Sequence, residues 1–91
     1  MRLVWTRLAS QDRAQIRDYI AQDNPAAALS LDELISQTAK RLVDQPSMGR
    51  PGRLQGTREW VAHKNYILVY DMSGDAVRIL RLLHAARRWP A

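Results

Sequence analysis

The sequence predicts an α+β fold with an N-terminal strand, a helical hairpin, a three-stranded antiparallel meander and a short C-terminal tail. Two segments with a helical period of apolar residues lie in the first half of the chain. Three segments rich in β-branched and aromatic residues lie in the second half, separated by short turns. Because 91 residues have room for one core, we expect a single domain over residues 1–91, with the helices packed on one face of the sheet.

The first half contains the expected strand and the helical hairpin. Met1–Trp5 is a short apolar run, and Thr6 can cap the helix that follows it. Asp23-Asn24-Pro25 should end this helix and start the next, since Asp and Asn are good caps and Pro suits a first helical turn. The second helix should end before Pro46, and these residues follow its period: Ala27, Leu31, Leu34, Ile35, Thr38, Leu42 and Val43.

The second half reads as a loop followed by the meander. Pro46–Gly56, with three glycines and two prolines, is expected to be a loop. The expected strands are Thr57–His63, Tyr66–Met72 and Ala76–His84. Strict alternation along the last strand would put Val77, Ile79, Arg81 and Leu83 on one face and Arg78, Leu80, Leu82 and His84 on the other. Both sets are largely apolar, so the face without helices should be partly bare, as partner sites often are.

Charge and composition narrow the function classes. The net charge is +5, and acids and bases balance over residues 1–44, so the excess lies in the second half. This distribution indicates a nucleic acid or an acidic protein surface as partner. Cysteine is absent and the two histidines are far apart, so we expect no disulfide, metal site or cofactor. The N-terminus has no long apolar segment, so we expect a cytoplasmic protein without a signal peptide or membrane span.

Two basic groups are candidate target-binding sites. Arg50, Arg53 and Arg58 lie on or beside the Gly/Pro loop, and the tail carries Arg87-Arg88-Trp89. Guanidinium groups suit phosphates and carboxylates, and Arg and Trp are enriched in binding hot spots. Three alternatives stay open. The loop arginines could be merely solvated, Arg58 could pair with Glu59 across the sheet, and the tryptophan could fold back on the sheet as a lid.

Several segments resemble the RelE/ParE superfamily, the toxins of bacterial type II toxin–antitoxin systems. They are Tyr19–Ala28, Gly56-Thr57-Arg58-Glu59, Asn65–Tyr70 and Leu83–Pro90. The resemblance covers nearly the whole chain and implies the same α+β fold. It also implies a toxin–antitoxin hetero-oligomer, in which a short acidic or amphipathic part of a cognate antitoxin lies over the helical hairpin and the sheet. Candidate antitoxin-binding residues are Leu29, Leu80 and Leu82.

The superfamily has two main activities: RelE-like ribosome-dependent cleavage of mRNA and ParE-like inhibition of DNA gyrase by binding. RelE-like toxins commonly carry a catalytic arginine where this chain has Ile67, and they use a tyrosine near the C-terminus. Here Trp89 is the only aromatic residue after Tyr70. His84 and Arg81 remain the candidate catalytic residues for an enzyme acting on the ribosome and mRNA. The sequence favours a ParE-like gyrase inhibitor, with the endoribonuclease and an inactive binding module as alternatives.

Overall fold

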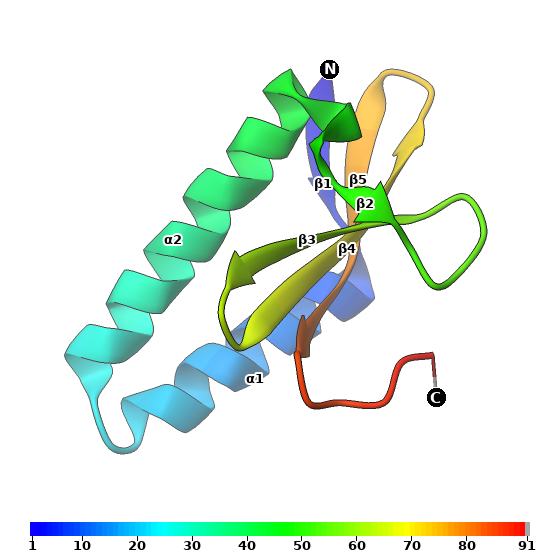
Figure 1. The fold of residues 1–91 in the computed structure, drawn as a ribbon. Coiled ribbons are helices and arrows are strands. Elements are labelled where there is room, and N and C mark those ends of the chain that lie inside the picture. Colours follow the sequence, from blue (N-terminus) through cyan, green and yellow to red (C-terminus); the bar gives the residue numbers. More distant parts are fainter. Residues whose placement is uncertain (91) are drawn as a thin grey trace.

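The computed structural model describes residues 1–90 and confirms the α+β fold (Figure 1). The elements in chain order are β1 (Arg2–Trp5), α1 (Arg7–Ala21), α2 (Pro25–Asp44), the 3-10 helix η1 (Pro46–Met48), β2 (Arg50–Pro51), β3 (Arg58–His63), β4 (Tyr66–Ser73) and β5 (Ala76–His84). The strands form one five-stranded sheet in the order β1-β5-β4-β3-β2. In residues 1–90, no helix has both the length and the apolar composition that a membrane span needs.

Both helices of the helical hairpin begin with a side-chain cap. The hydroxyl of Thr6 accepts a hydrogen bond from the Ala9 N–H at 3.2 Å, and it donates to the Ile79 carbonyl at 2.8 Å. The first helix is therefore capped and tied to β5 by the same side chain. At the start of α2 the Asn24 side chain accepts from the Ala27 N–H at 3.0 Å. Each cap satisfies a backbone donor that the helix itself leaves unpaired.

The sheet combines one parallel pair with an antiparallel meander. β1 pairs with β5 in parallel, and the other neighbours are antiparallel. Gly74, at φ +59°, begins the two-residue turn between β4 and β5, where glycine adopts a positive φ at little cost. The expectation that Pro46–Gly56 is only a loop is wrong, because it contains η1 and the edge strand β2. Pro51 is compatible with β2 because proline is tolerated on an edge strand.

Apolar side chains fill both faces of the sheet. The main core lies between the sheet and the helices and contains Ala9, Ile35, Ala39, Leu42, Leu68, Tyr70, Val77, Ile79 and Leu82. A smaller cluster of Ile67, Val69 and Leu83 lies on the opposite face, with Leu80 and Trp89 packed against it. Figure 1 shows the helices on one side of the sheet and the C-terminal tail on the other.

The strict alternation expected along β5 is wrong past Ile79. The register of the β4–β5 ladder shifts there, so Leu80 is an extra residue without a partner in the ladder. Such a bulge moves the following side chains to the opposite faces. Leu82 therefore lies in the main core at 1% exposure, while Leu83 joins Leu80 on the face away from the helices.

Asp12 on α1 completes the hydrogen bonding of β5. Because β1 ends at Trp5, opposite Ile79, the next part of β5 has no strand on that side. The carboxylate of Asp12 accepts from the Leu82 N–H at 3.0 Å and from Arg81 Nε and Nη2 at 2.7 and 3.0 Å. The hydrogen bond to Asp12 raises the pKa of Arg81, so this guanidinium stays charged. A single side chain thus joins the first helix to the last strand.

Tyr70 fixes the connection between α2 and the sheet. Its hydroxyl donates to the Pro46 carbonyl at 2.7 Å and accepts from the Gly49 N–H at 2.9 Å. Burial raises the pKa of Tyr70, so the phenol keeps the proton it donates. A side chain at position 49 would bring its Cβ within 2.8 Å of a Tyr70 ring carbon. The close approach of backbone and ring therefore requires glycine.

We expect Asp12→Ala to lower the free energy of unfolding by about 2–4 kcal/mol, because it leaves a largely buried guanidinium and a buried N–H without their acceptor. The measurement is denaturant unfolding followed by circular dichroism. Asp75→Asn is the matched control, since the Arg2–Asp75 pair is exposed on both sides. The control should change stability by about 0–0.5 kcal/mol. Equal losses in the two variants would contradict the role given to Asp12.

Candidate target-binding surface

The candidate surface is the open face, defined as the side of the sheet away from α1 and α2, where Ile67, Val69 and Leu83 cluster. Backbone hydrogen bonds hold the tail that follows β5 to the turn between β3 and β4 and to the end of β5. The Ala85 N–H donates to the Asn65 carbonyl at 2.7 Å, and the Arg87 N–H donates to the His84 carbonyl at 2.9 Å. These bonds turn the chain back, so the tail lies on the open face (Figure 1).

Trp89 covers part of the open face. It packs against the apolar cluster, and the guanidinium carbon of Arg81 lies 5.5 Å from its ring centroid, within the range of a cation–π contact. Its carbonyl accepts from Arg53 Nη1 at 3.1 Å. The indole Nε1 is buried and has no hydrogen-bond partner within residues 1–90. Trp89 is therefore folded back on the sheet, which is the lid position that the sequence left open.

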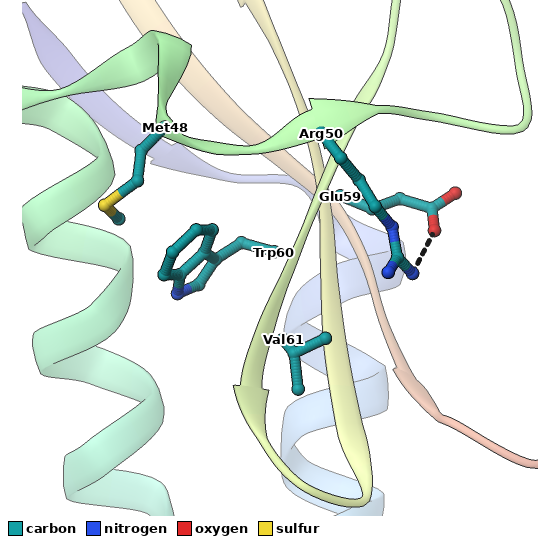
Figure 2. A pocket seen from close by; sticks show the side chains of 5 residues that line it. All are labelled: Met48, Arg50, Glu59, Trp60 and Val61. Carbon is teal, nitrogen blue, oxygen red and sulfur yellow. Dashed lines mark hydrogen bonds and ion pairs between the residues drawn. The ribbon is translucent and has the colours of Figure 1, made fainter.

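Glu59 forms ion pairs with two of the loop arginines, Arg50 and Arg53. Its side chain is 2% exposed, and it accepts from Arg50 Nη2 at 3.2 Å and from the Arg53 backbone N–H at 3.0 Å. The Arg53 guanidinium also lies 3.6 Å from it. Figure 2 shows Arg50 and Glu59 meeting on one side of β3. A buried carboxylate requires such partners, so this ion cluster fixes the loop and, through Arg53, holds the tail.

Arg58 lies on the other face of the sheet. It donates to the Gly49 carbonyl at 2.8 Å, beside Tyr70 and the helices. The alternative that Arg58 pairs with Glu59 is excluded, because successive residues of a strand point to opposite faces. The three loop arginines therefore do not form one group. Arg50 and Arg53 belong to the open face, and Arg58 belongs to the helix side.

The tail arginines are exposed cations that follow the end of β5, and Arg87 lines a small hollow with Asp12, Gln15, Ile16, Leu82 and His84. Arg87 and Arg88 are both exposed, and within residues 1–90 neither takes part in an ion pair. An apolar hollow of about 380 Å³ lies nearby, lined by Thr6, Arg7, Leu8, Leu54, Leu80, Arg81 and Trp89. Exposed cations next to an apolar hollow are suited to a protein surface that carries acidic and apolar groups.

The two catalytic candidates, Arg81 and His84, differ in whether their side chains already have a charged partner. Arg81 is held by two bonds to Asp12. His84 is exposed, and its Nδ1 accepts from the Ala86 N–H at 3.1 Å, so neutral His84 carries its proton on Nε2. The ring of Tyr66 contacts His84 edge-on at a centroid distance of 5.3 Å. His84 and Tyr66 thus lie in contact. Arg81, the second catalytic candidate, is already paired with Asp12, whereas Arg87 lines the same hollow as His84 and takes part in no ion pair within residues 1–90.

The position of Ile67 bears on catalysis. Its side chain is 7% exposed and belongs to the apolar cluster beneath the tail. A side chain in this environment neither donates a hydrogen bond to phosphate nor transfers a proton. Ile67, which stands where the resemblance to RelE-like toxins would place a catalytic arginine, is therefore part of a small apolar core.

The three candidate antitoxin-binding residues lie in different environments. Leu29 is 69% exposed on α2, Leu80 is half-buried on the open face, and Leu82 is 1% exposed in the main core. A partner can reach Leu29 and Leu80 in this conformation, whereas Leu82 is covered by the helices. Sequence reasoning missed Val61, a β-branched strand residue that is 45% exposed. It also missed Glu59 as the residue that organises the loop, although an isolated acid in a basic segment is a signal for such a role.

Comparison with known proteins identifies the family. Residues 3–89 match the family described as ParE toxin of type II toxin–antitoxin system, parDE. The chain is 40% identical over 90 residues to the Sinorhizobium fredii protein named "Putative toxin Y4kP", covering 98% of this chain and 93% of that protein. It is 36% identical over 85 residues to Toxin RelE2 of Caulobacter vibrioides, covering 93% and 96%.

Solved structures agree with the sequence matches. A chain of the chromosomal ParDE system from P. aeruginosa superposes with a TM-score of 0.83 at 28% identity, covering 92% of this chain and 95% of that one. The YoeB/ParE toxin from Agrobacterium tumefaciens, at 20% identity and a TM-score of 0.65 over 92% and 98%, shares the fold. The architecture is that of a small bacterial toxin of the RelE/ParE type. The chain belongs to the ParE toxin family of type II toxin–antitoxin systems, and this membership implies an antitoxin partner.

We expect Trp89→Ala to lower the free energy of unfolding by about 1–3 kcal/mol, since it uncovers the apolar cluster and removes the stacking on Arg81. Thermal unfolding of the purified toxin measures the change. Arg88→Ala is the control, because this exposed neighbour should change stability by about 0–0.5 kcal/mol. A Trp89→Ala variant as stable as the wild type would mean that the tail does not pack on the sheet in solution.

Proposed function

We propose that this toxin inhibits DNA gyrase by binding it and has no hydrolytic site of its own. The observation that carries the proposal is the open face, where Ile67 is buried in an apolar cluster, Leu80 and Trp89 line an apolar hollow, and Arg81 is held by Asp12. Cleavage of RNA requires an acid, a base and cations around the phosphate. An apolar surface with exposed cations is better suited to recognition of a protein. The match to the ParE family supports the same reading.

We propose that Arg87 and Arg88, with Trp89 beside them, contact the target. Arg87 and Arg88 are exposed, Trp89 lines the apolar hollow, and all three belong to residue types that often supply binding energy. The exposed side of Arg50 adds a further cation near this surface. The cognate antitoxin would neutralise the toxin by binding it before gyrase does. All three proteins would meet in the cytoplasm.

A second candidate function is RelE-like cleavage of mRNA on the ribosome. It is favoured by the contact between exposed His84 and half-buried Tyr66 and by the 36% identity to Toxin RelE2. In that case His84 would act as the acid or base, and the tail arginines would contact the phosphate backbone. The two candidates make opposite predictions in purified systems.

The discriminating experiment uses the purified toxin in two assays. In a gyrase supercoiling assay, micromolar toxin should inhibit the enzyme or trap cleaved DNA. In a reconstituted translation assay, the same preparation should leave ribosome-bound mRNA intact. His84→Gln should keep its activity in the gyrase assay, because no proton transfer is required. Codon-specific cleavage of mRNA that is lost in His84→Gln would replace the proposal with the endoribonuclease.

We expect the double variant Arg87→Ala/Arg88→Ala to lose at least tenfold in toxicity while it folds normally and still binds the antitoxin, because both side chains are exposed. Growth after graded induction measures toxicity. The charge-matched control is Arg17→Ala/Lys40→Ala, which removes two cations from the helices. A double tail variant with full toxicity would exclude these arginines and transfer the proposal to Arg50, Arg53 and Arg58.

A further inference from the structure

The edge of the sheet at β3 is only half covered. β2 pairs with Arg58 and Glu59 and ends there. The remainder of β3, Trp60–His63, has no strand on its outer side within residues 1–90, and we call it the open half of β3. In Figure 1, β2 lies at one end of β3, away from the turn that leads into β4. Uncovered strand edges are sites where another extended chain can pair.

The backbone groups of Val61 point to this uncovered side. The Thr57 carbonyl accepts from the Gly52 N–H at 2.8 Å, so it points toward the segment that contains β2. Backbone groups alternate between the two edges of a strand, so residues 57, 59 and 61 share a direction. Glu59 pairs with Arg50 on that edge. Val61 is the next residue with that direction, and its N–H and C=O are left for a partner.

Side chains around the open half of β3 form an apolar hollow. It measures about 260 Å³ and is lined by Met48, Arg50, Glu59, Trp60 and Val61. Figure 2 shows Trp60 and Met48 on the side of α2, with Val61 nearer the turn. Val61 is 45% exposed, and Leu34 on α2 is 39% exposed. An added strand would find an apolar contact for its side chains next to free backbone groups.

The charge around this edge is positive. Arg50 is the first residue of β2 and lies next to the open half of β3, and its side chain is 56% exposed despite its contact with Glu59. Lys64 is exposed in the turn after β3, and Arg41 is exposed on α2 with its guanidinium 3.9 Å from the Met48 sulfur. Cations at both ends and beside the hollow would attract an acidic segment and repel a second copy of this basic chain.

We propose that the open half of β3 is a docking edge for the antitoxin, which adds an extended segment of alternating apolar and acidic residues as a further strand. The backbone of Val61 supplies the hydrogen bonds, and the hollow beside Trp60 takes an apolar side chain. This inference rests on the antitoxin partnership and is independent of the gyrase target. The outer edge of β1 also has free backbone groups, but the hollow and the cations described above lie at β3.

The test uses the full-length toxin and the antitoxin encoded beside it. Hydrogen exchange of the Val61 amide should slow at least tenfold in the complex. Val61→Pro should weaken antitoxin binding roughly tenfold or more, because it removes the outward N–H without removing a ladder bond. Thermal unfolding and gyrase inhibition without antitoxin should stay close to those of the wild type, so a failure of this proposal is distinguishable from a failure of the gyrase assignment.

A pair of charge variants gives an independent readout. Val61→Glu should weaken binding of an acidic segment, whereas Met72→Glu should not, because Met72 is similarly exposed at 42% but lies on β4, beyond the residues that pair with β3 and away from its open half. Unchanged exchange at Val61 in the complex would overturn the proposal, as would protection confined to Leu3 and Trp5. Concentration-dependent protection of Val61 in the toxin alone would assign the edge to a second copy and would overturn it too.

Discussion

The three hydrogen bonds of the Asp12 carboxylate are the constraint on which the arrangement depends. β1 is too short to cover the whole of β5, and the bulge at Leu80 turns the last residues of that strand. The carboxylate takes the place of the missing strand for the Leu82 N–H and also neutralises Arg81. The first helix, the final strand and the start of the tail are therefore positioned by one side chain. A group with three partners of fixed direction also excludes small shifts of α1 along the sheet.

A consequence for function is that most arginines of the open face already have a carboxylate partner before any target binds. Glu59 contacts both Arg50 and Arg53 and offsets one of their two positive charges, and Asp12 offsets the charge of Arg81. The net positive charge available to a partner is therefore carried mainly by exposed cations at the rim, such as Arg87 and Arg88. Buried pairs shape the surface and hold the tail, and rim charges contribute to encounter and selectivity. This division explains why a count of arginines from the sequence overstates the number that can meet a target.

The elements of this fold were predictable because their signals are local. The caps at Thr6 and Asn24 and the glycine turn at Gly74 each depend on residues close in the chain. The bulge at Leu80 and the strand β2 were not predictable, since both depend on pairing with distant residues. The same holds for the site. The sequence identifies the basic residues. It does not show that Glu59 pairs with Arg50 and Arg53 but not with Arg58, or that Leu82 is buried, because both result from tertiary packing. An alternating pattern cannot reveal where an extra residue interrupts it.

The three tryptophans of this chain each report on a different surface. Trp5 lies beneath the guanidinium of Arg13 at 4.7 Å, at the contact between the helices and the sheet. Trp60 borders the uncovered edge, and Trp89 rests on the opposite face against Arg81. Their intrinsic fluorescence is therefore a built-in set of spectroscopic probes. Variants that keep one indole at a time would allow events at the helix layer, the strand edge and the tail to be followed separately in the unlabelled toxin.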